Sequence, residues 1–347
     1  MKNKICVVFT GGTIGSSVKS GTVSLDSKSN SLLINKYIDS YGKKISFDEL
    51  YPVSMLSENV QKTDLEKIVD CIEGIDFSAY DGIIVTHGTD TLCFSANYLS
   101  QVFYAISVPV VLVSANYPLE DERTNGLKNF AGAVTFIETA DVKGVFVSFT
   151  NPGEECKIHL ASRLVDAEQF SGNFSSLLSI EFGSVKDNRF IRNTDPRNPT
   201  AEQINAIESR PQLKKLKKLC EDIMVIDARA LLNFDLFSFE KVRVKAVILN
   251  LYHSGTICTV GTHTNAVEFA KRCKNSSIEV VLSSVDSSAN VYEGMSDTFK
   301  GCVKSFDTSH EMTAVKVMLA LGEGLSIKEV LETDNFFEML HTPVVNV

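Results

Sequence analysis

Two short stretches of the sequence combine threonine hydroxyls with glycines immediately after an apolar run. TGGT occupies residues 10–13 and follows the apolar run 5–9, and HGTDT occupies residues 87–91 and follows the apolar run 82–86. A threonine hydroxyl can attack a carbonyl carbon when a base removes its proton and backbone N–H groups stabilise the oxyanion that forms. Glycine supplies the backbone freedom and the close approach that such a site needs. The two stretches are therefore candidates for parts of one nucleophilic site.

A third polar stretch supplies a group that can handle protons. Lys157 lies in NPGEECKIH, which follows the apolar run 144–149. Burial lowers the pKa of a lysine and a neighbouring carboxylate raises it again, so a lysine beside Asp90 could work near neutral pH. We interpret Thr13 as the candidate nucleophile, and Thr89, Asp90 and Lys157 as a proton-handling set.

Each candidate also has an ordinary structural explanation. Thr89 and Asp90 at the start of a predicted helix are typical of a helix cap, and a single Lys157 is typical of a surface lysine. Thr13 fits a turn hydroxyl, and Glu58 fits a carboxylate in the first turn of a helix. Their common position favours a shared function, because ligands of open parallel sheets bind beyond the carboxyl ends of the strands.

The glycine pattern matches the common nucleotide-binding loops poorly. A GxGxxG fingerprint needs glycine where Thr10 stands. A phosphate-binding P-loop needs Gly-Lys followed by Ser or Thr, and residues 14–16 are Ile-Gly-Ser. The hydroxyl chemistry is the interpretation that remains.

The elements that must position these residues follow an α/β pattern. Short apolar runs predict strands at 4–9, 82–86, 109–114 and 144–149, and helical periodicity predicts helices near 31–40, 62–74, 91–105 and 124–135. This alternation indicates an N-terminal domain with a doubly wound, mostly parallel sheet.

A polar stretch separates a second domain from the first. Residues 187–220 contain three prolines and the segment LKKLKKL, which fits a solvated helix face better than a nucleic-acid patch. Beyond it, apolar runs at 223–227, 246–251 and 278–283, with helices near 263–274 and 311–322, predict a smaller, Rossmann-like α/β domain. We place the domains at 1–192 and 221–347, with 193–220 as the connection.

Composition and charge narrow the classes of protein. The 347 residues carry a net charge of −9, which gives no reason to expect nucleic acid or a membrane as a partner. The first apolar run is too short for a secretory signal, and no stretch approaches the roughly 20 apolar residues that span a bilayer. Eight cysteines without a CxxC pair predict reduced thiols and no zinc site. We therefore expect a cytoplasmic protein.

The chain resembles the bacterial L-asparaginase family, in which a threonine is the nucleophile. The resemblance rests on TGGTI at 10–14 together with HGTDT at 87–91, and it extends over the whole chain. SEN at 57–59, SANYP at 114–118, and Lys157 followed by His159 agree with it. It implies hydrolysis of the side-chain amide of L-asparagine to L-aspartate and ammonia, without a metal or cofactor.

The resemblance also implies catalytic roles. Thr13 matches the family's first-loop nucleophile. Thr89 and Lys157 match a second threonine and its lysine. Asp90 would serve both that lysine and the α-amino group of the substrate.

Further residues are implied for substrate binding. Ser57 and Glu58 match the pair that holds the α-carboxylate and α-amino groups, and Gly12 and Gly88 complete the substrate-binding set. Family members are homotetramers assembled from close dimers, so a homodimer or homotetramer is implied.

The sequence departs from the family pattern at several places. The family usually has a tyrosine on the segment after TGGTI that helps to activate the nucleophile, but residues 16–30 contain none and Thr22 stands near that place. Tyr117 occupies a position where the family generally has an arginine. Asn250 and Glu293 are candidates for the contribution of a partner subunit. Residues 15–30, rich in serine, glycine and lysine, fit a lid over the substrate.

Three alternatives stay open at this point. The first is an amidase that prefers another amide, such as glutamine, which is one methylene longer than asparagine. The second is an ammonia-supplying subunit of a tRNA-dependent amidotransferase, although such subunits normally carry an extra N-terminal domain and TGGTIG begins here at residue 10. The third is a non-catalytic amino-acid sensor that has kept the pocket.

Overall fold

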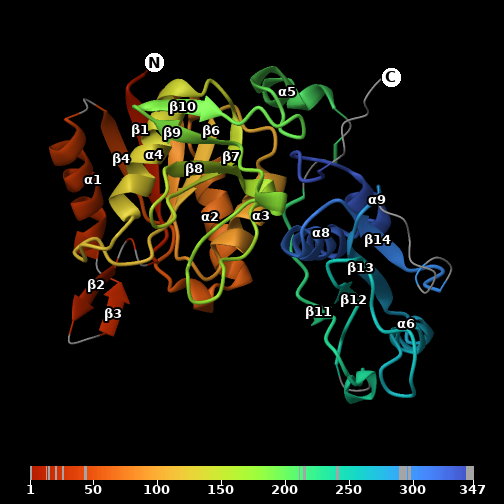
Figure 1. The fold of residues 1–347 in the computed structure, drawn as a ribbon. Coiled ribbons are helices and arrows are strands. Elements are labelled where there is room, and N and C mark those ends of the chain that lie inside the picture. The colour runs from red at the N-terminus through yellow and green to blue at the C-terminus, as the bar shows by residue number, and fades with distance from the viewer. Residues whose placement is uncertain are drawn as a thin grey trace. The chain divides into compact units, whose positions relative to one another are not determined.

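The structure is a computed structural model, and it divides into two compact units, Met1–Arg210 and Pro211–Val347 (Figure 1). It describes residues 2–12, 14, 16–19, 22–25, 27–42, 45–210, 212–213, 216–239, 242–288, 295 and 298–340, with only the backbone described for 16–19, 22–25 and 27–31. The division between the units falls inside the stretch 193–220 that the sequence predicts as a connection. Residues 193–210 belong to the first unit.

An eight-stranded sheet forms the centre of the first unit, in the order β10-β9-β8-β7-β6-β5-β1-β4. The strands are β1 (Lys4–Phe9), β4 (Ser46–Leu50), β5 (Gly82–Thr86), β6 (Pro109–Val113), β7 (Gly144–Phe149), β8 (Cys156–Leu160), β9 (Gly183–Lys186) and β10 (Arg189–Arg192). β4, β1, β5, β6 and β7 are parallel, whereas β8, β9 and β10 extend the sheet in antiparallel fashion. β5 and β7 are buried along their whole length, which explains their nearly continuous apolar sequences.

Helices cover both faces of this sheet, as a doubly wound fold requires (Figure 1). They are α1 (Ser27–Tyr41), α2 (Lys62–Glu73), α3 (Leu92–Val102) and α4 (Gly126–Thr139), and a short α5 (Ala201–Asn205) follows β10. α1 packs with α4, and α2 packs with α3. An antiparallel hairpin of β2 (Ser16–Lys19) and β3 (Thr22–Leu25) precedes α1. The predicted α/β class with a mostly parallel sheet is confirmed.

The second unit contains a smaller, fully parallel sheet. Its strands β11 (Ile223–Asp227), β12 (Ala246–Asn250), β13 (Glu279–Val285) and β14 (Val303–Phe306) are adjacent in chain order. The described part of this unit includes the helices α6 (Ala266–Asn275), α8 (His310–Glu323) and α9 (Ile327–Glu332). Apolar side chains of β11–β13 pack against α6 to form a core of its own.

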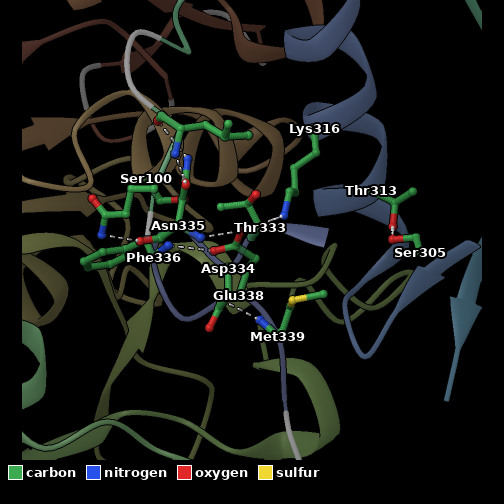
Figure 2. A network of polar contacts seen from close by, with 12 residues as sticks. Ser100, Ser305, Thr313, Lys316, Thr333, Asp334, Asn335, Phe336, Glu338 and Met339 are labelled. Carbon is green, nitrogen blue, oxygen red and sulfur yellow. Dashed lines mark hydrogen bonds and ion pairs between the residues drawn. The ribbon is translucent and has the colours of Figure 1, made fainter. Parts of the chain in front are cut away.

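A buried ion pair ties the end of the described chain to α8. Lys316 and Glu338 have side chains that are 1% and 0% exposed, and Lys316 Nζ lies 2.8 Å from Glu338 Oε1. The Glu338 carboxylate also accepts hydrogen bonds from the backbone N–H groups of Asn335 and Phe336, and Lys316 donates to the carbonyl of Thr333 (Figure 2). Both charges are compensated locally, as burial demands.

The longest described helix, α1, has 15 residues. Across the described ranges, none of the helices combines the length and apolar character needed to cross a membrane.

Candidate active site

The carboxyl ends of β1 and β5 lie side by side at the point where the winding of the first sheet reverses. The parallel strands follow one another along the chain as β1, β4, β5, β6 and β7, but in the sheet β1 lies between β4 and β5. Phe9 and Thr86, the last residues of β1 and β5, are register partners. In open α/β sheets, ligands bind beyond the strand ends at such a switch point. The TGGT and HGTDT stretches both begin there.

Two buried threonines join the ends of these strands. The Thr10 hydroxyl donates to the carbonyl of Thr86 at 2.6 Å, and the backbone N–H of Thr10 donates to the Thr86 hydroxyl at 3.3 Å. Both side chains are fully buried. The first hydroxyl of TGGT is therefore structural, because it is used to hold the two loops at one end of the sheet.

Close backbone contacts bring three polar loops together. A Cβ atom added to Gly12 would lie 2.3 Å from the backbone nitrogen of Gly88, and one added to Gly88 would lie 2.3 Å from Ser57 Oγ. Gly12 also has a φ of +79°, which favours glycine. Its N–H donates to the carbonyl of Met55 at 3.1 Å. Glycine is required at both positions because the loops touch there.

Polar side chains fix the Ser57 loop against the start of α3. Ser57–Asn59 forms one turn of 3-10 helix, and the Thr91 hydroxyl donates to the carbonyl of Ser57 at 2.9 Å. The buried Ser57 hydroxyl lies 3.5 Å from Asp90 Oδ2, at the long limit of a hydrogen bond. Four predicted site residues, Gly12, Ser57, Gly88 and Asp90, therefore lie within one set of contacts.

The chemically useful groups of these loops are accessible. Asp90 and Glu58 are exposed and Thr89 is partly exposed. The N-cap position of α3 is Thr91, and no side chain caps this helix. Among the described residues, the Thr89 hydroxyl has no hydrogen-bond partner, so capping of α3 does not account for Thr89 or Asp90.

A buried histidine shapes the HGTDT turn. His87 Nδ1 lies 2.8 Å from the carbonyl oxygen of Gly88, so this nitrogen carries the proton and donates it. Complete burial lowers the pKa of His87, which keeps the imidazole neutral. Sequence reasoning gave His87 no role, although a histidine directly after a buried strand is a usable signal for it.

Lys157 lies on a strand rather than in the loop that the sequence suggests. It is the second residue of β8 and pairs in register with Phe149, so it lies at the edge of the sheet where β7 ends. Its Nζ donates to Glu181 Oε1 at 3.1 Å, and both side chains are about one quarter exposed, at 28% and 26%. In the described part of the chain, no hydrogen bond joins Lys157 to Thr89 or Asp90. Glu181 therefore holds the place beside the lysine that we expected Asp90 to take.

Glu181 and His159 complete a cluster around this lysine. His159 is buried and its Nδ1 lies 2.9 Å from the Ser176 hydroxyl. Burial lowers the pKa of His159 to about 4, opposed by the charge of Glu181 and assisted by that of Lys157. Partial burial raises the pKa of Glu181, but its own backbone N–H and the Lys157 ammonium outweigh burial and leave this pKa below its usual range. The cluster therefore contains a carboxylate and a neutral imidazole near pH 7.

Several sequence candidates fall outside this set of contacts. Thr13 and Glu293 lie outside the described residues. Asn250 ends β12 in the second unit, and its amide donates to Asp227 Oδ1 at 2.8 Å. Tyr117, at the position of a family arginine, has the guanidinium of Arg123 4.1 Å above its ring centre. The segment expected to form a lid contains the β2–β3 hairpin.

Comparison with known protein sequences gives consistent matches. Residues 4–197 match the family profile described as "Asparaginase, N-terminal". The L-asparaginase of Thermococcus kodakarensis is 24% identical over 335 residues, covering 94% of this chain and 95% of that protein. A subunit of the glutamyl-tRNA(Gln) amidotransferase of Methanosarcina mazei is 26% identical over 343 residues, covering 92% of this chain and 74% of that protein.

Solved structures share the fold over nearly the whole chain. The thermostable L-asparaginase from Thermococcus kodakarensis matches with a TM-score of 0.77 at 22% identity, covering 98% of this chain and 100% of that one. L-asparaginase I from Vibrio cholerae matches with a TM-score of 0.76 at 20% identity, covering 97% of this chain and 98% of that one.

Proposed function

The chain belongs to the asparaginase family, and on that premise we propose that it hydrolyses the side-chain amide of L-asparagine to L-aspartate and ammonia. The observation that carries this proposal is the contact of Gly12 with Gly88 and of Gly88 with Ser57. These contacts bring three loops with hydroxyl and carboxylate groups to the switch point of the sheet, where a small ligand would bind. Similarity to an L-asparaginase along nearly the whole chain supports the choice of amide.

In the proposed reaction Thr13, which directly follows Gly12, attacks the carboxamide carbon of the substrate. The negative charge that develops on the amide oxygen is stabilised by backbone N–H groups of the glycine loops. Expulsion of ammonia leaves an ester on the threonine, and water cleaves this ester to give L-aspartate and the free hydroxyl. The overall change is amide plus water to carboxylate plus ammonia.

The second threonine loop supplies the groups around this step. The Thr89 hydroxyl is accessible and does not cap α3, so it is available to the reacting atoms. Lys157 contributes a positive charge at the same edge of the sheet. Residues 16–30 contain no tyrosine, so another side chain or a water molecule removes the proton of Thr13 in this proposal.

A zwitterionic amino acid fits the charges of these loops. The carboxylates of Asp90 and Glu58 would bind the α-ammonium group, and the hydroxyl of Ser57 would bind the α-carboxylate. Ser57 is fixed by Thr91 and lies against Gly88, which gives it one defined position. A substrate without an α-ammonium group should therefore bind poorly.

A second candidate function is supply of ammonia from glutamine. Similarity to an amidotransferase component over 92% of this chain favours it. Glutamine and asparagine differ by one methylene group, which a binding site distinguishes by about 1–3 kcal/mol. The values of kcat/KM for the two amides decide between these functions: the proposal expects the value for asparagine to be the higher by about tenfold or more.

Ammonia release from L-asparagine tests the mechanism. Thr13→Ala and Thr89→Val should each reduce kcat by at least about a hundredfold, because they remove a nucleophile or a group that acts with it. Thr139→Val is the matched control, since Thr139 lies at the end of α4 and its hydroxyl bonds within the scaffold. Normal turnover in both site variants would refute the mechanism. Tight binding of L-aspartate without any hydrolysis would instead identify an amino-acid sensor.

A further inference from the structure

The carboxylate nearest to Lys157 comes from a part of the chain with no role in the site so far. Glu181 Oε1 lies 3.1 Å from Lys157 Nζ, 24 residues further along the sequence. The pair is about three quarters buried, so solvent screens it less than an exposed ion pair. Asp90, the carboxylate expected beside this lysine, instead lies 3.5 Å from the Ser57 hydroxyl.

The protein scaffold holds Glu181 firmly. Its backbone carbonyl accepts hydrogen bonds from the side-chain amides of Asn193 at 3.0 Å and Asn198 at 2.9 Å. Lys157 is held equally well, because β8 pairs with β7 on one side and with β9 on the other. Two residues on fixed backbones therefore meet through their side chains at the edge of the sheet.

Resting on the proposed function, we infer that Glu181 is the positioning residue of Lys157: its carboxylate pairs with the lysine side chain and fixes where the amine lies. Lys157 then acts in the reaction as a charged hydrogen-bond donor and not as a neutral base. The sequence pattern alone allows both roles. The contact with Glu181 favours the first role, because an amine held 3.1 Å from a carboxylate donates a charge-assisted hydrogen bond to it.

The two roles predict opposite effects of removing the carboxylate. If Lys157 acts as a positioned cation, Glu181→Gln lowers kcat for L-asparagine about ten- to a hundredfold and leaves KM within about threefold, since a charge that loses its position loses catalytic effect. Glu181→Asp, which keeps the charge on a shorter side chain, should give an intermediate kcat. If Lys157 acts as a neutral base, Glu181→Gln leaves kcat unchanged or raises it, and the inference is overturned.

A second ion pair, which links the β8 and β9 segments of the chain, provides a matched control. Lys186 on β9 lies 3.4 Å from Glu155, which directly precedes β8, and both side chains are about half exposed. Glu155→Gln therefore removes a carboxylate that pairs with a lysine other than Lys157. It should leave kcat and KM at the values of the unaltered protein. Thermal unfolding of each variant shows whether it has folded.

The chemical reactivity of Lys157 tests its pairing with Glu181 without any measurement of hydrolysis. Trace labelling with acetic anhydride, followed by mass spectrometry of the labelled peptides, measures the reactivity of each lysine. Glu181→Gln should increase the labelling of Lys157 severalfold, because the amine loses the carboxylate that holds and covers it. Glu155→Gln should leave the labelling of Lys157 unchanged. Equal labelling of Lys157 in the unaltered protein, Glu181→Gln and Glu155→Gln would overturn the inference. If the unaltered protein hydrolyses no amide but the labelling difference is observed, only the proposed function is refuted.

Discussion

Gly12 and Gly88 are in backbone contact, so close that a methyl group added to Gly12 would lie 2.3 Å from the Gly88 nitrogen. Real Cβ atoms do not approach other heavy atoms so closely, and the two loops follow strands whose last residues, Phe9 and Thr86, are buried. The glycines of the two motifs therefore serve the same purpose. They let the loops that follow β1 and β5 meet, and this brings Gly88 against Ser57, whose hydroxyl lies 3.5 Å from Asp90 Oδ2.

Substitution of Gly12 should damage both stability and activity. Gly12→Ala should cost the roughly 1–2 kcal/mol of a left-handed conformation plus the energy of separating the loops. Gly153→Ala is a matched control, because Gly153 has a φ of +78° but nothing within 4 Å of the added Cβ. Urea unfolding should show a larger loss for Gly12→Ala than for Gly153→Ala, with hydrolysis impaired only in the former. Equal losses would mean that the loops are not in tight contact.

Removal of the Asp90 carboxylate should impair substrate recognition. In the proposed complex Asp90 binds the α-ammonium group, so Asp90→Asn should lower kcat/KM for L-asparagine about a hundredfold. Asp121→Asn serves as the control. Asp121 lies in the loop between β6 and α4, where its carboxylate pairs with Arg123. This control should keep its kcat/KM. A decrease of the same size in both variants would indicate a general effect of charge rather than recognition by Asp90.

The central strands of the fold are well predicted from the sequence. β1, β5 and β7 coincide with the expected ranges, because a parallel strand that is buried on both faces must be apolar along its length. β4 and β10 were not expected. Their sequences, SFDEL and RFIR, contain charged residues because the strands are the two edges of the sheet and are only partly buried.

The candidate site could be predicted only in part. The glycine loops can be recognised by residue type, since their conformations tolerate little else. Glu181 could not be found in this way, because nothing in SIEFGSV shows that its carboxylate reaches Lys157. That contact depends on the antiparallel strands β8 and β9, whose short and partly polar sequences do not indicate a register.

Buried His159 should make stability depend on pH. Its pKa is about 4 in the folded protein and 6.5 in an unfolded chain. Between these values the unfolded chain binds a proton that the folded protein does not, so stability falls as the pH decreases from 6.5 to 4, by about 3 kcal/mol. Urea unfolding of His159→Asn, which keeps a polar group near Ser176, should show a smaller decrease over this range. Parallel curves for the two proteins would contradict the assignment.

The buried pair of Lys316 and Glu338 should be strongly coupled to stability (Figure 2). Glu338→Gln leaves the ammonium group of Lys316 buried without its counter-ion, which should cost about 3–5 kcal/mol of unfolding free energy. Glu268→Gln is the control, because the Lys271–Glu268 pair has the similar length of 2.7 Å but is mostly exposed. Denaturant unfolding should show a loss below about 1 kcal/mol for this control.

The Lys316–Glu338 pair should also make the free energy of unfolding depend on pH. Burial raises the pKa of Glu338, but the Lys316 charge outweighs burial and leaves this pKa below its usual value of 4.5. The stabilising contribution of the carboxylate is therefore complete above pH 4.5 and is lost as the pH falls below that value. The difference in stability between the unaltered protein and Glu338→Gln should narrow as it does so. A constant difference would show that Glu338 is not the group that titrates.

A crystal structure with bound L-aspartate, the product of the proposed reaction, is the decisive measurement for the proposed site. We expect aspartate to lie against the Gly12 and Gly88 loops, with its α-ammonium group within hydrogen-bond distance of Asp90 and its side-chain carboxylate next to Thr13 and Thr89. Aspartate bound at another place in crystals soaked to saturation, with these loops unoccupied, would contradict it.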